Sequence, residues 1–267
     1  MMYSVRQYLF PRTLEEAHQL LHNHPSNTII GGSTYLRLGG KTIDTAVDIS
    51  RLGLKYIMET EDTIVIGAGT TLREVENSPL LNRYFNGILN KSVRHIVGVQ
   101  LRNLATVGAN VFARFGFSDL NTALLTLDVD VELYQGGLMP LRQFLQKGVG
   151  GRDILVKLII QKSERQASFQ MLRNSQGDYA ILNAAVSRLE NDWRIVVGAR
   201  PGRCEIAGGA SAFLGEGSLT PERIDQATQM AVGEMTFGSN IRGSKEYRQG
   251  ICPVLIKRAV QEVLAWK

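Results

Sequence analysis

The sequence predicts an α+β fold in two domains, and three observations indicate it. Up to about residue 150, apolar segments of strand length alternate with segments whose apolar residues recur at helical spacing. From Ile154 on, strand-like segments follow one another across short polar turns, and two helical segments come last. The chain has 267 residues, 44% of them hydrophobic, enough for one large core or two ordinary ones. We place the boundary near residue 163, which gives domains 1–163 and 164–267.

The first elements follow from capping and periodicity. Thr13 and Glu16 have the spacing of a capping box, and apolar residues then recur at helical spacing as far as Leu21. An apolar run over 28–30 ends at two glycines, which indicates a buried strand that enters a loop. Further patterns predict strands over 46–49, 63–66 and 129–134, helices over 72–81 (broken by Pro79), 86–96 and 122–127, a loop-rich segment over 98–117 and a turn at Gly136-Gly137.

The C-terminal part reads as an antiparallel sheet covered by helices. Its predicted strands are 154–160, 167–172, 179–189 and 193–197. Its predicted helices are 221–230 and 245–266. Pro253 is expected near the first turn of a helix or at a kink, because proline cannot donate the backbone hydrogen bond that a helix interior needs.

Composition excludes several classes of protein. No apolar stretch approaches about 18 residues without a charge or a turn residue, so we expect no membrane span. The N-terminus has no apolar region of signal-peptide length, so we expect a cytoplasmic protein. Cys204 and Cys252 are the two cysteines, too few for an iron–sulfur cluster or a structural zinc on thiolates alone. The chain has neither a Gly-x-Ser-x-Gly elbow nor a Walker A loop.

The positive charge is concentrated in one segment. Lys and Arg total 30 against 25 Asp and Glu, a net charge of +5. Between Glu76 and Asp119 there is no acidic residue, and that stretch holds the five cations Arg83, Lys91, Arg94, Arg102 and Arg114. A local positive field suits a phosphate-bearing ligand or an acidic partner, although a solvated basic face is the simpler interpretation. The cations are not interleaved with aromatics and no nucleic-acid motif is present, so we expect no nucleic-acid partner.

Two conspicuous patterns fail closer tests. Residues 63–69 look like the strand and first glycines of a dinucleotide-binding fold, but Leu72 stands where a third glycine belongs and no acidic residue follows about 20 residues on. His18 and His22 share a helix face, but nothing else that could ligate a metal lies near them in the sequence. We therefore predict no metal site and interpret these histidines as surface residues.

Two segments carry chemistry suited to a phosphate. They are Thr28–Leu36, which contains Gly31-Gly32-Ser33-Thr34, and Arg102–Asn110, which is followed by Ser118-Asp119. Loops rich in Gly, Ser, Thr and Asn present N–H groups and hydroxyls that can cradle a pyrophosphate. The Asp119 carboxylate could accept hydrogen bonds from the hydroxyls of a sugar. Each segment taken alone is equally consistent with an ordinary tight turn.

Together, these segments resemble a family over nearly the whole chain. The sequence is similar to the FAD-binding medium subunit of the molybdenum hydroxylases, the group that includes xanthine dehydrogenase and carbon monoxide dehydrogenase. The matching segments are the Phe10–Ala17 opening, Ile30–Thr34 for an A-G-G-T-D type loop, Arg102–Asn110 for R-N-x-A-T-x-G-G-N, Ser118-Asp119 for an S-D pair, Gly177–Ala180 for G-D-F-A, and Gly243–Ala259 for the C-terminal helix.

The resemblance implies a fold and a set of cofactor contacts. The fold would be a two-part FAD-binding domain of the vanillyl-alcohol-oxidase type, with subdomains of about 1–55 and 56–163, followed by a small α+β domain. The cofactor would be FAD. Its binding residues would be Ile29, Ile30, Gly31, Gly32, Ser33, Thr34, Ala105, Thr106, Gly108, Asn110, Ser118, Asp119, Ile154 and Leu155. Ile154 and Leu155 are also predicted core residues of a strand, and one residue can both pack in the core and contact the cofactor.

The sequence departs from the family at three places. Ala109 stands where a second glycine is usual, which would keep the backbone farther from a phosphate. Ser33-Thr34 replaces the common Thr-Asp of the first loop. Members often carry a lysine near the flavin, seven or eight residues before the aspartate of G-D-F-A, and here those positions are Met171 and Gln170.

The resemblance also implies partners and a role. The molybdopterin site would lie in a separate large subunit and the [2Fe-2S] clusters in a small one. FAD would take electrons from a cluster and pass them to NAD or another acceptor, so we assign no catalytic residue to this chain. Two alternatives remain open: a stand-alone flavin reductase of the same fold, and a structural subunit that has lost FAD.

Overall fold

The computed structural model describes residues 4–36, 40 and 42–266. These residues form two compact units that interleave along the chain. Unit 1 comprises the chain up to Glu74 together with Val99–Ala113 and Val129–Gln161, and unit 2 comprises Val75–Gly98, Arg114–Asp128 and the chain from Lys162 on. Across the described residues, no helix is long and apolar enough to span a bilayer.

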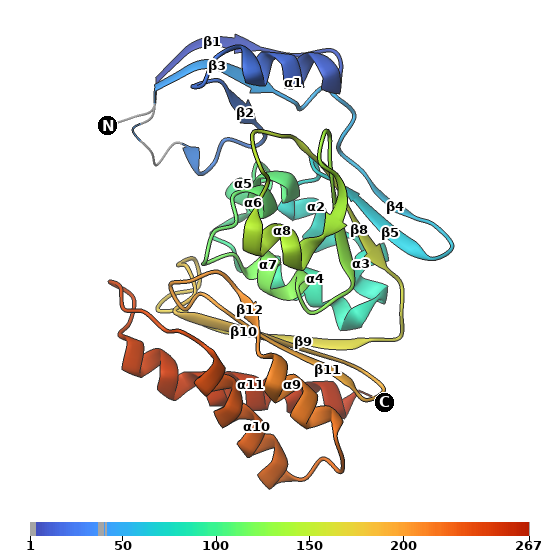
Figure 1. Cartoon of the computed structure of the whole chain (residues 1–267), viewed down its shortest axis with the longest axis vertical. Coiled ribbons are helices and arrows are strands. Elements are labelled where there is room, and N and C mark those ends of the chain that lie inside the picture. Colours follow the sequence, from blue (N-terminus) through green and yellow to red (C-terminus); the bar gives the residue numbers. More distant parts are fainter. Residues whose placement is uncertain (1–3, 37–39, 41, 267) are drawn as a thin grey trace. The chain divides into compact units, whose positions relative to one another are not determined.

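A three-stranded parallel sheet opens unit 1. Its order is β1 (Ser4–Leu9), β3 (Thr42–Asp48) and β2 (Thr28–Ile30). Helix α1 (Leu14–Asn23) packs its buried side chains, among them Ala17 and Leu21, into a core shared with Val47 of β3 (Figure 1). The Thr13 hydroxyl accepts a hydrogen bond from Glu16 N at 3.1 Å, which confirms the predicted cap. The Glu16 carboxylate accepts from Arg12 N at 2.7 Å, one residue before the position that a capping box uses.

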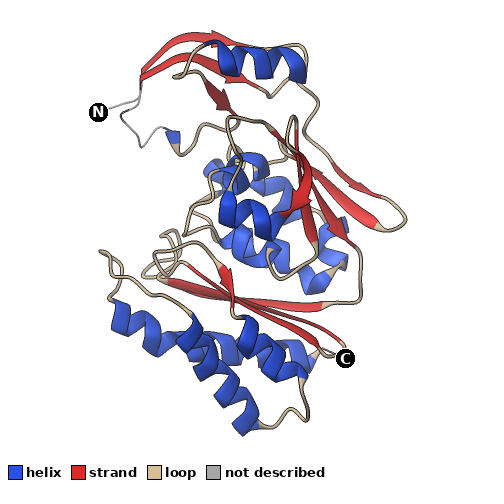
Figure 2. Cartoon of the chain, in the orientation of Figure 1, coloured by secondary structure: helices blue, strands red, loops and turns tan. Residues whose placement is uncertain are grey.

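A five-stranded antiparallel sheet completes unit 1. Its order is β4-β5-β8-β6-β7, with strands β4 (Ile57–Glu59), β5 (Thr63–Gly67), β8 (Leu155–Gln161), β6 (Val129–Leu133) and β7 (Gly137–Pro140). Strands are red and helices blue in Figure 2. Because β5 pairs antiparallel with both of its neighbours, residues 63–69 do not begin a parallel βαβ unit. The helices of this unit are α5 (Val99–Arg102), α6 (Val107–Phe112) and α8 (Leu141–Lys147), and α2 (Leu72–Asn77) runs across the division between the units.

Unit 2 contains a four-stranded antiparallel sheet whose two faces differ in chemistry. Its order is β12 (Glu205–Ile206), β11 (Asp192–Gly198), β10 (Leu182–Leu189) and β9 (Gln166–Leu172). On β10, Leu182, Ala184 and Val186 join the apolar core formed with the helices α9 (Gly208–Gly215), α10 (Pro221–Glu234) and α11 (Lys245–Ala265), which cover one face of the sheet (Figure 1).

Among the alternate residues of β10, Asn183 and Ser187 are polar and bond to the N-terminal part of unit 2, while Ala185 between them is apolar. Asn183 Oδ1 accepts from Thr122 Oγ1 at 3.0 Å, and Ser187 Oγ donates to Thr126 O at 2.7 Å. Thr122 belongs to α7 (Asp119–Leu124), which lies with α3 (Pro79–Arg83), a 3₁₀ turn (Phe85–Gly87) and α4 (Ile88–Val93) in the same unit. The period of two along a strand therefore separates an apolar face from a hydrogen-bonding face.

Several sequence expectations need correction. The segment 98–117, expected to be loop-rich, contains α5 and α6, and the helix expected over 122–127 begins at Asp119. Helices α6 and α7 are short, and each depends on a capping hydroxyl. Thr106 accepts from Ala109 N at 3.3 Å at the start of α6, and Ser118 accepts from Asn121 N at 3.1 Å at the start of α7. Of the two alternatives for Pro253, the first turn of a helix is wrong, because the residue lies inside α11.

The sequence prediction placed the strand 154–160 in the wrong sheet. It forms β8, which lies between β5 and β6 of unit 1 and not beside β9. Strand β10 begins at Leu182 rather than Tyr179. Periodicity gave no indication of β1, β4, β7, β12, α8 and α9, most of which are short or exposed on one side.

A fully buried arginine fixes the loop that precedes α11. Arg248 is 0% exposed, and its guanidinium donates to Ile181 O at 2.8 Å, to Gly238 O at 2.9 Å and to Asn240 Oδ1 at 2.7 Å. It also donates to Gly243 O. One side chain thus ties α11 to the start of β10 and to residues 238–243.

We predict that Arg248→Met lowers the free energy of unfolding by about 3 kcal/mol, because it leaves several buried acceptors without a donor. Arg258→Met, which removes an exposed arginine from the same helix, should change it by less than about 0.5 kcal/mol. Urea unfolding of both variants measures the difference. Equal effects would contradict the assigned role of Arg248.

Candidate functional site

The two glycine-containing loops that the sequence singled out lie against each other in unit 1. The first loop is residues 29–34, at the end of β2, and the second loop is residues 104–110. A Cβ added to Gly32 would lie 1.5 Å from Leu104 O, and one added to Gly31 would lie 2.8 Å from Thr106 Oγ1. No side chain fits in the first of these spaces, so glycine at position 32 permits the contact between the loops.

The second loop is hydrogen-bonded to the residues that follow β5. Gly108 N donates to Ala68 O, Val107 N to Thr70 O and Leu72 N to Ala105 O, each at 2.8 Å. A Cβ on Gly108 would lie 2.6 Å from Ala68 Cβ. The sequence analysis interpreted residues 67–71 only as a failed dinucleotide motif and missed this supporting role. The signal that could have found it is the Gly-Ala-Gly of residues 67–69, whose small side chains allow close packing of the backbone.

The groups that these loops offer suit an anion. Residues 31–34 are half-buried, and Ser33 has the left-handed φ of 55° that aims successive N–H groups in one direction. Thr106 is buried, and its hydroxyl holds the start of α6. Neither 28–36 nor 99–113 contains an acidic residue, so nothing in these segments repels a phosphate. The backbone amides of the first loop and the hydroxyls of Ser33, Thr34 and Thr106 fit a diphosphate group.

Ala109, which departs from the family pattern, lies on the exposed side of α6. Its Cβ would lie 3.7 Å from a Cβ at Gly31, so its methyl group lies beside the first loop. The methyl group of Ala109 reduces the space beside the first loop but does not prevent the contact between the two loops.

Two predicted cofactor contacts lie in the core. Ile154 is 1% exposed and packs in the cluster that contains Ala17, Leu21 and Val47, and Leu155, at the start of β8, is 4% exposed. The structure thus places Ile154 in the packed interior of unit 1, and contact of either side chain with a cofactor stays a prediction.

Ser118 and Asp119 belong to unit 2, where Asp119 forms a buried ion pair that the sequence analysis did not foresee. Asp119 Oδ2 pairs with Arg173 Nη2, with side chains 4% and 7% exposed. Asp119 Oδ1 accepts from Asn183 Nδ2 at 2.6 Å. Both carboxylate oxygens are therefore engaged within the chain. The partners lie 54 and 64 residues away in the sequence, so no local pattern could have indicated them.

Burial changes the pKa of Asp119 in this pair. Desolvation raises the pKa of Asp119, and the Arg173 charge together with the Asn183 hydrogen bond opposes that rise. Arg173 also donates to Asp178 O, and its Nε lies 3.0 Å from Met171 Sδ. The Arg173 guanidinium is thus held two residues after Met171, one of the two positions at which family members often carry a lysine.

The side chain at the other candidate lysine position has a structural partner. Gln170 Nε2 donates to Glu262 Oε2 at 2.8 Å, and Glu262 also accepts from Ser168 Oγ at 2.7 Å and pairs with Lys91 Nζ at 2.7 Å. Burial raises the pKa of Glu262, but Lys91 and the other donors outweigh it and hold that pKa below its usual value. This carboxylate connects α11 with β9 and α4.

The cations between Glu76 and Asp119 differ in exposure. Arg102 lies in unit 1 and is 5% exposed, whereas Arg83 and Arg94 are exposed residues of unit 2. Lys91 is paired with Glu262. Arg102 is therefore not part of an exposed basic face, and a glutamate there would place a charge in the interior.

The two thiols are not reactive groups. Both cysteines are free and buried, and burial raises the pKa of Cys204 and of Cys252 to about 12. Among the residues that the structure describes, no three His, Cys, Asp or Glu side chains are grouped as a metal site requires.

Two protein families match the chain. Residues 3–160 match the family described as "FAD binding domain in molybdopterin dehydrogenase", and residues 167–263 match "CO dehydrogenase flavoprotein C-terminal domain". The chain is 26% identical to the nicotine 6-hydroxylase medium subunit of Paenarthrobacter nicotinovorans over 276 residues, 96% of each protein. It is 35% identical to the nicotinate dehydrogenase FAD-subunit of Eubacterium barkeri over 134 residues, 48% of this chain and 45% of that protein.

Solved structures show the same fold. The reconstituted CO dehydrogenase from Oligotropha carboxidovorans has a chain that superposes with a TM-score of 0.92 at 22% identity, over 100% of both chains. Quinoline 2-oxidoreductase from Pseudomonas putida 86 gives a TM-score of 0.88 at 21% identity, over 98% of both chains.

The fold, the loop pair and the matched families define a flavoprotein. The chain belongs to the family of FAD-binding domains of molybdopterin dehydrogenases, since that family covers more than half of it. It is an oxidoreductase of the molybdenum hydroxylase group, its cofactor is FAD, and its C-terminal part is of the CO dehydrogenase flavoprotein type.

We predict that Gly32→Ala reduces FAD content to below about a tenth, because the added methyl forces the loops apart, at a cost of about 3 kcal/mol in stability. Gly150→Ala is the matched control, since a Cβ there meets nothing within 4 Å. Flavin absorbance per protein and thermal unfolding measure both effects. Normal FAD content in Gly32→Ala would contradict the close approach of the loops.

The ion pair gives a second prediction, with a sign that depends on pH. In Arg173→Gln the pKa of Asp119 should rise further above its unfolded value, so the folded state holds the proton more tightly than the unfolded state. Stability should then fall as pH rises, with a loss of about 3 kcal/mol at pH 7.5 that shrinks toward pH 5.

The double variant Asp119→Asn/Arg173→Gln separates charge from packing. It lacks the titrating carboxyl, so its stability relative to the wild type should not show this pH dependence. Urea unfolding at the two pH values measures both proteins. The same pH profile in the single and double variants would show that Asp119 does not depend on Arg173.

Proposed function

We propose that the chain is the FAD-carrying medium subunit of a molybdenum hydroxylase complex. The observation that carries the proposal is the pair of loops in unit 1, whose contact requires Gly32 and whose polar groups suit a diphosphate. The full-length similarity to a nicotine 6-hydroxylase medium subunit supports the same role. We also propose the domain division near residue 163 and a cytoplasmic location.

The proposed work of the chain's residues is to bind and orient the cofactor. The first loop, with Gly31, Gly32, Ser33 and Thr34, would hold the diphosphate through backbone N–H groups and hydroxyls. The second loop would add the side chains of Thr106 and Asn110, while Gly108 allows it to pack closely on Ala68. Ser118 and Asp119, which belong to unit 2, are proposed as further cofactor contacts, with Asp119 oriented by Arg173 and Asn183. FAD, when bound, supplies the redox chemistry, and no side chain needs to act as an acid or base.

The proposed partners are a large subunit that binds molybdopterin and a small subunit with [2Fe-2S] clusters. The cysteine count of this chain supports the division of labour, since two buried thiols cannot bind a cluster. Electrons would arrive from a cluster and leave to NAD or another acceptor. The alternative of a stand-alone flavin reductase predicts activity without partners.

Purification of the tagged chain from its native cells tests the proposal. We expect two further chains to co-purify, with iron, molybdenum and about one FAD per complex, and the tag alone to retain none of them. The chain expressed by itself should show a flavin absorption band near ~450 nm, release FAD on heating, and oxidise no substrate. Substrate turnover by the isolated chain would favour the stand-alone reductase instead.

A further inference from the structure

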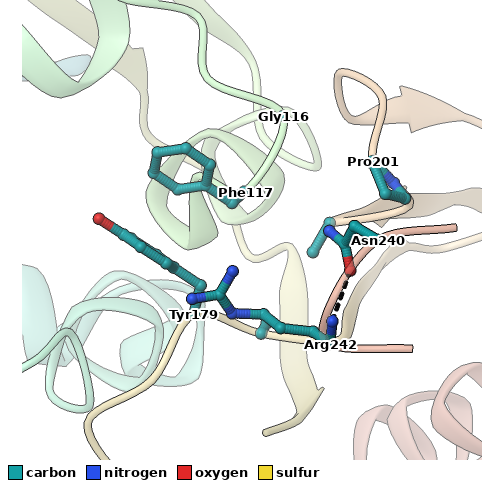
Figure 3. Close-up of a pocket in the computed structure, with 8 residues that line it drawn as sticks. Gly116, Phe117, Tyr179, Pro201, Asn240 and Arg242 are labelled. Carbon is teal, nitrogen blue, oxygen red and sulfur yellow. Dashed lines mark hydrogen bonds between the residues drawn. The ribbon is translucent and has the colours of Figure 1, made fainter. Parts of the chain in front are cut away.

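The pocket of unit 2 that Figure 3 shows has a charged group that is already paired. Phe117, Tyr179 and Arg242 are among its lining residues. The Arg242 guanidinium is paired with Asp178 Oδ1 at 2.8 Å, and Arg242 N donates to Asn240 Oδ1 at 2.9 Å. A side-chain pair that is better placed for a further ligand lies in unit 1.

Two histidine rings lie against each other on helix α1. The ring centroids of His18 and His22 are 4.2 Å apart, and the ring planes are tilted by 41°. The two residues are four positions apart, so consecutive turns of the helix place their side chains on one face. His22 is exposed and His18 is half-buried, so an ion in solution can reach the pair.

One hydrogen bond decides which nitrogen of His22 can bind an ion. His22 Nδ1 lies 2.9 Å from the carbonyl oxygen of His18. A carbonyl oxygen can only accept, so Nδ1 carries the proton, and the neutral ring keeps its lone pair on Nε2. Histidines that bind metals commonly donate their other ring N–H to a backbone carbonyl, which orients the ring and raises the basicity of the ligating nitrogen. His22 is therefore oriented as a ligand through Nε2.

The His18 ring is restricted by a second neighbour. The Tyr134 ring lies against it, with centroids 5.3 Å apart and planes tilted by 47°. Two imidazole nitrogens that bind one ion at about 2.1 Å and near a right angle place their ring centroids roughly 4.5 Å apart. The 4.2 Å between His18 and His22 is close to that spacing. A small rotation of one ring therefore suffices for both to bind the same ion.

The helix that carries the two rings is anchored. Ala17 and Leu21 are buried in the core of unit 1. Just beyond the helix end, Arg152 Nη1 donates to His24 O at 2.8 Å, and Arg152 Nη2 donates to Asn27 O. Because the backbone is already ordered, binding at the histidine pair costs little further ordering.

We propose that His18 and His22 bind a divalent transition-metal ion, each through one ring nitrogen, with water in the remaining positions. Structural and catalytic metal sites use three or more protein ligands, which the described residues do not offer as a group, so this ion exchanges with solution. Imidazole suits Cu²⁺, Ni²⁺ and Zn²⁺, whereas Mg²⁺ prefers oxygen ligands. The inference does not depend on FAD binding, because it rests on α1 and Tyr134 alone.

Calorimetric titration of the full chain, purified without a histidine tag, tests the proposal. We expect a Kd of about 10 µM for Cu²⁺, weaker binding of Ni²⁺ and Zn²⁺, and no detectable binding of Mg²⁺. Absence of Cu²⁺ binding would overturn the site. Binding of Mg²⁺ as tight as that of Ni²⁺ would indicate carboxylate ligands and would also overturn it.

Variants then assign the ligands. His18→Gln and His22→Gln should each weaken Cu²⁺ binding about tenfold or more, because the second ring no longer binds intramolecularly. His24→Gln is the matched control, since His24 Nδ1 accepts from Ser26 N at 3.3 Å and its lone pair is engaged. It should bind Cu²⁺ as the wild type does. Unchanged affinity in His18→Gln or His22→Gln, or an equal loss in His24→Gln, overturns the proposal.

Long-range ¹H–¹⁵N NMR spectra of the imidazole rings test the ligand atom directly. Without metal, neutral His22 should be the Nδ1–H tautomer, because the His18 carbonyl holds that proton. Added Zn²⁺ should shift His22 Nε2 and the His18 ring and leave the His24 ring unchanged. The Nε2–H tautomer at His22, or shifts confined to His24, would contradict the proposal.

Discussion

The contact between the first and second loops in unit 1 leaves no space for a side chain at Gly32. The cofactor assignment depends on this close contact. A methyl group there would occupy the position of Leu104 O. The second loop is fastened in turn to residues 68–72 by three backbone hydrogen bonds of 2.8 Å. Because β5 is paired on both sides, the loops stand on a rigid support. Preorganised backbone donors are what a diphosphate site needs, since they cost little to order on binding.

Unit 2 depends on buried guanidinium groups instead. Arg248 donates to four acceptors from different segments, and Arg173 joins Asp119 to the turn before β10. Buried charges of this kind add little net stability, but removing one partner is costly because the other charge is left unpaired. Their effect is to give the segments around residues 178 and 240 single, defined positions.

Much of the local structure could be predicted because its causes are local. The Thr13 cap and strand 28–30 follow from neighbouring residues, and the motifs of both loops, together with the other segments that resemble the family, indicated FAD. Helix α6 was not predicted, because one capping threonine and six residues that include Gly108 produce no helical period. Sheet membership was missed for β8, since a strand's sequence does not name its partner. The Asp119–Arg173 pair was missed for the same reason, because it forms across 54 residues.

The central claim is that FAD is held by the two loops, and amide NMR tests it most directly. FAD is titrated into the ¹⁵N-labelled chain while the shift of each assigned N–H is followed. The account predicts that the largest changes occur at residues 31–34 and 106–110, and that they saturate at one FAD per chain. Binding that leaves those amides unchanged while shifting others would contradict it.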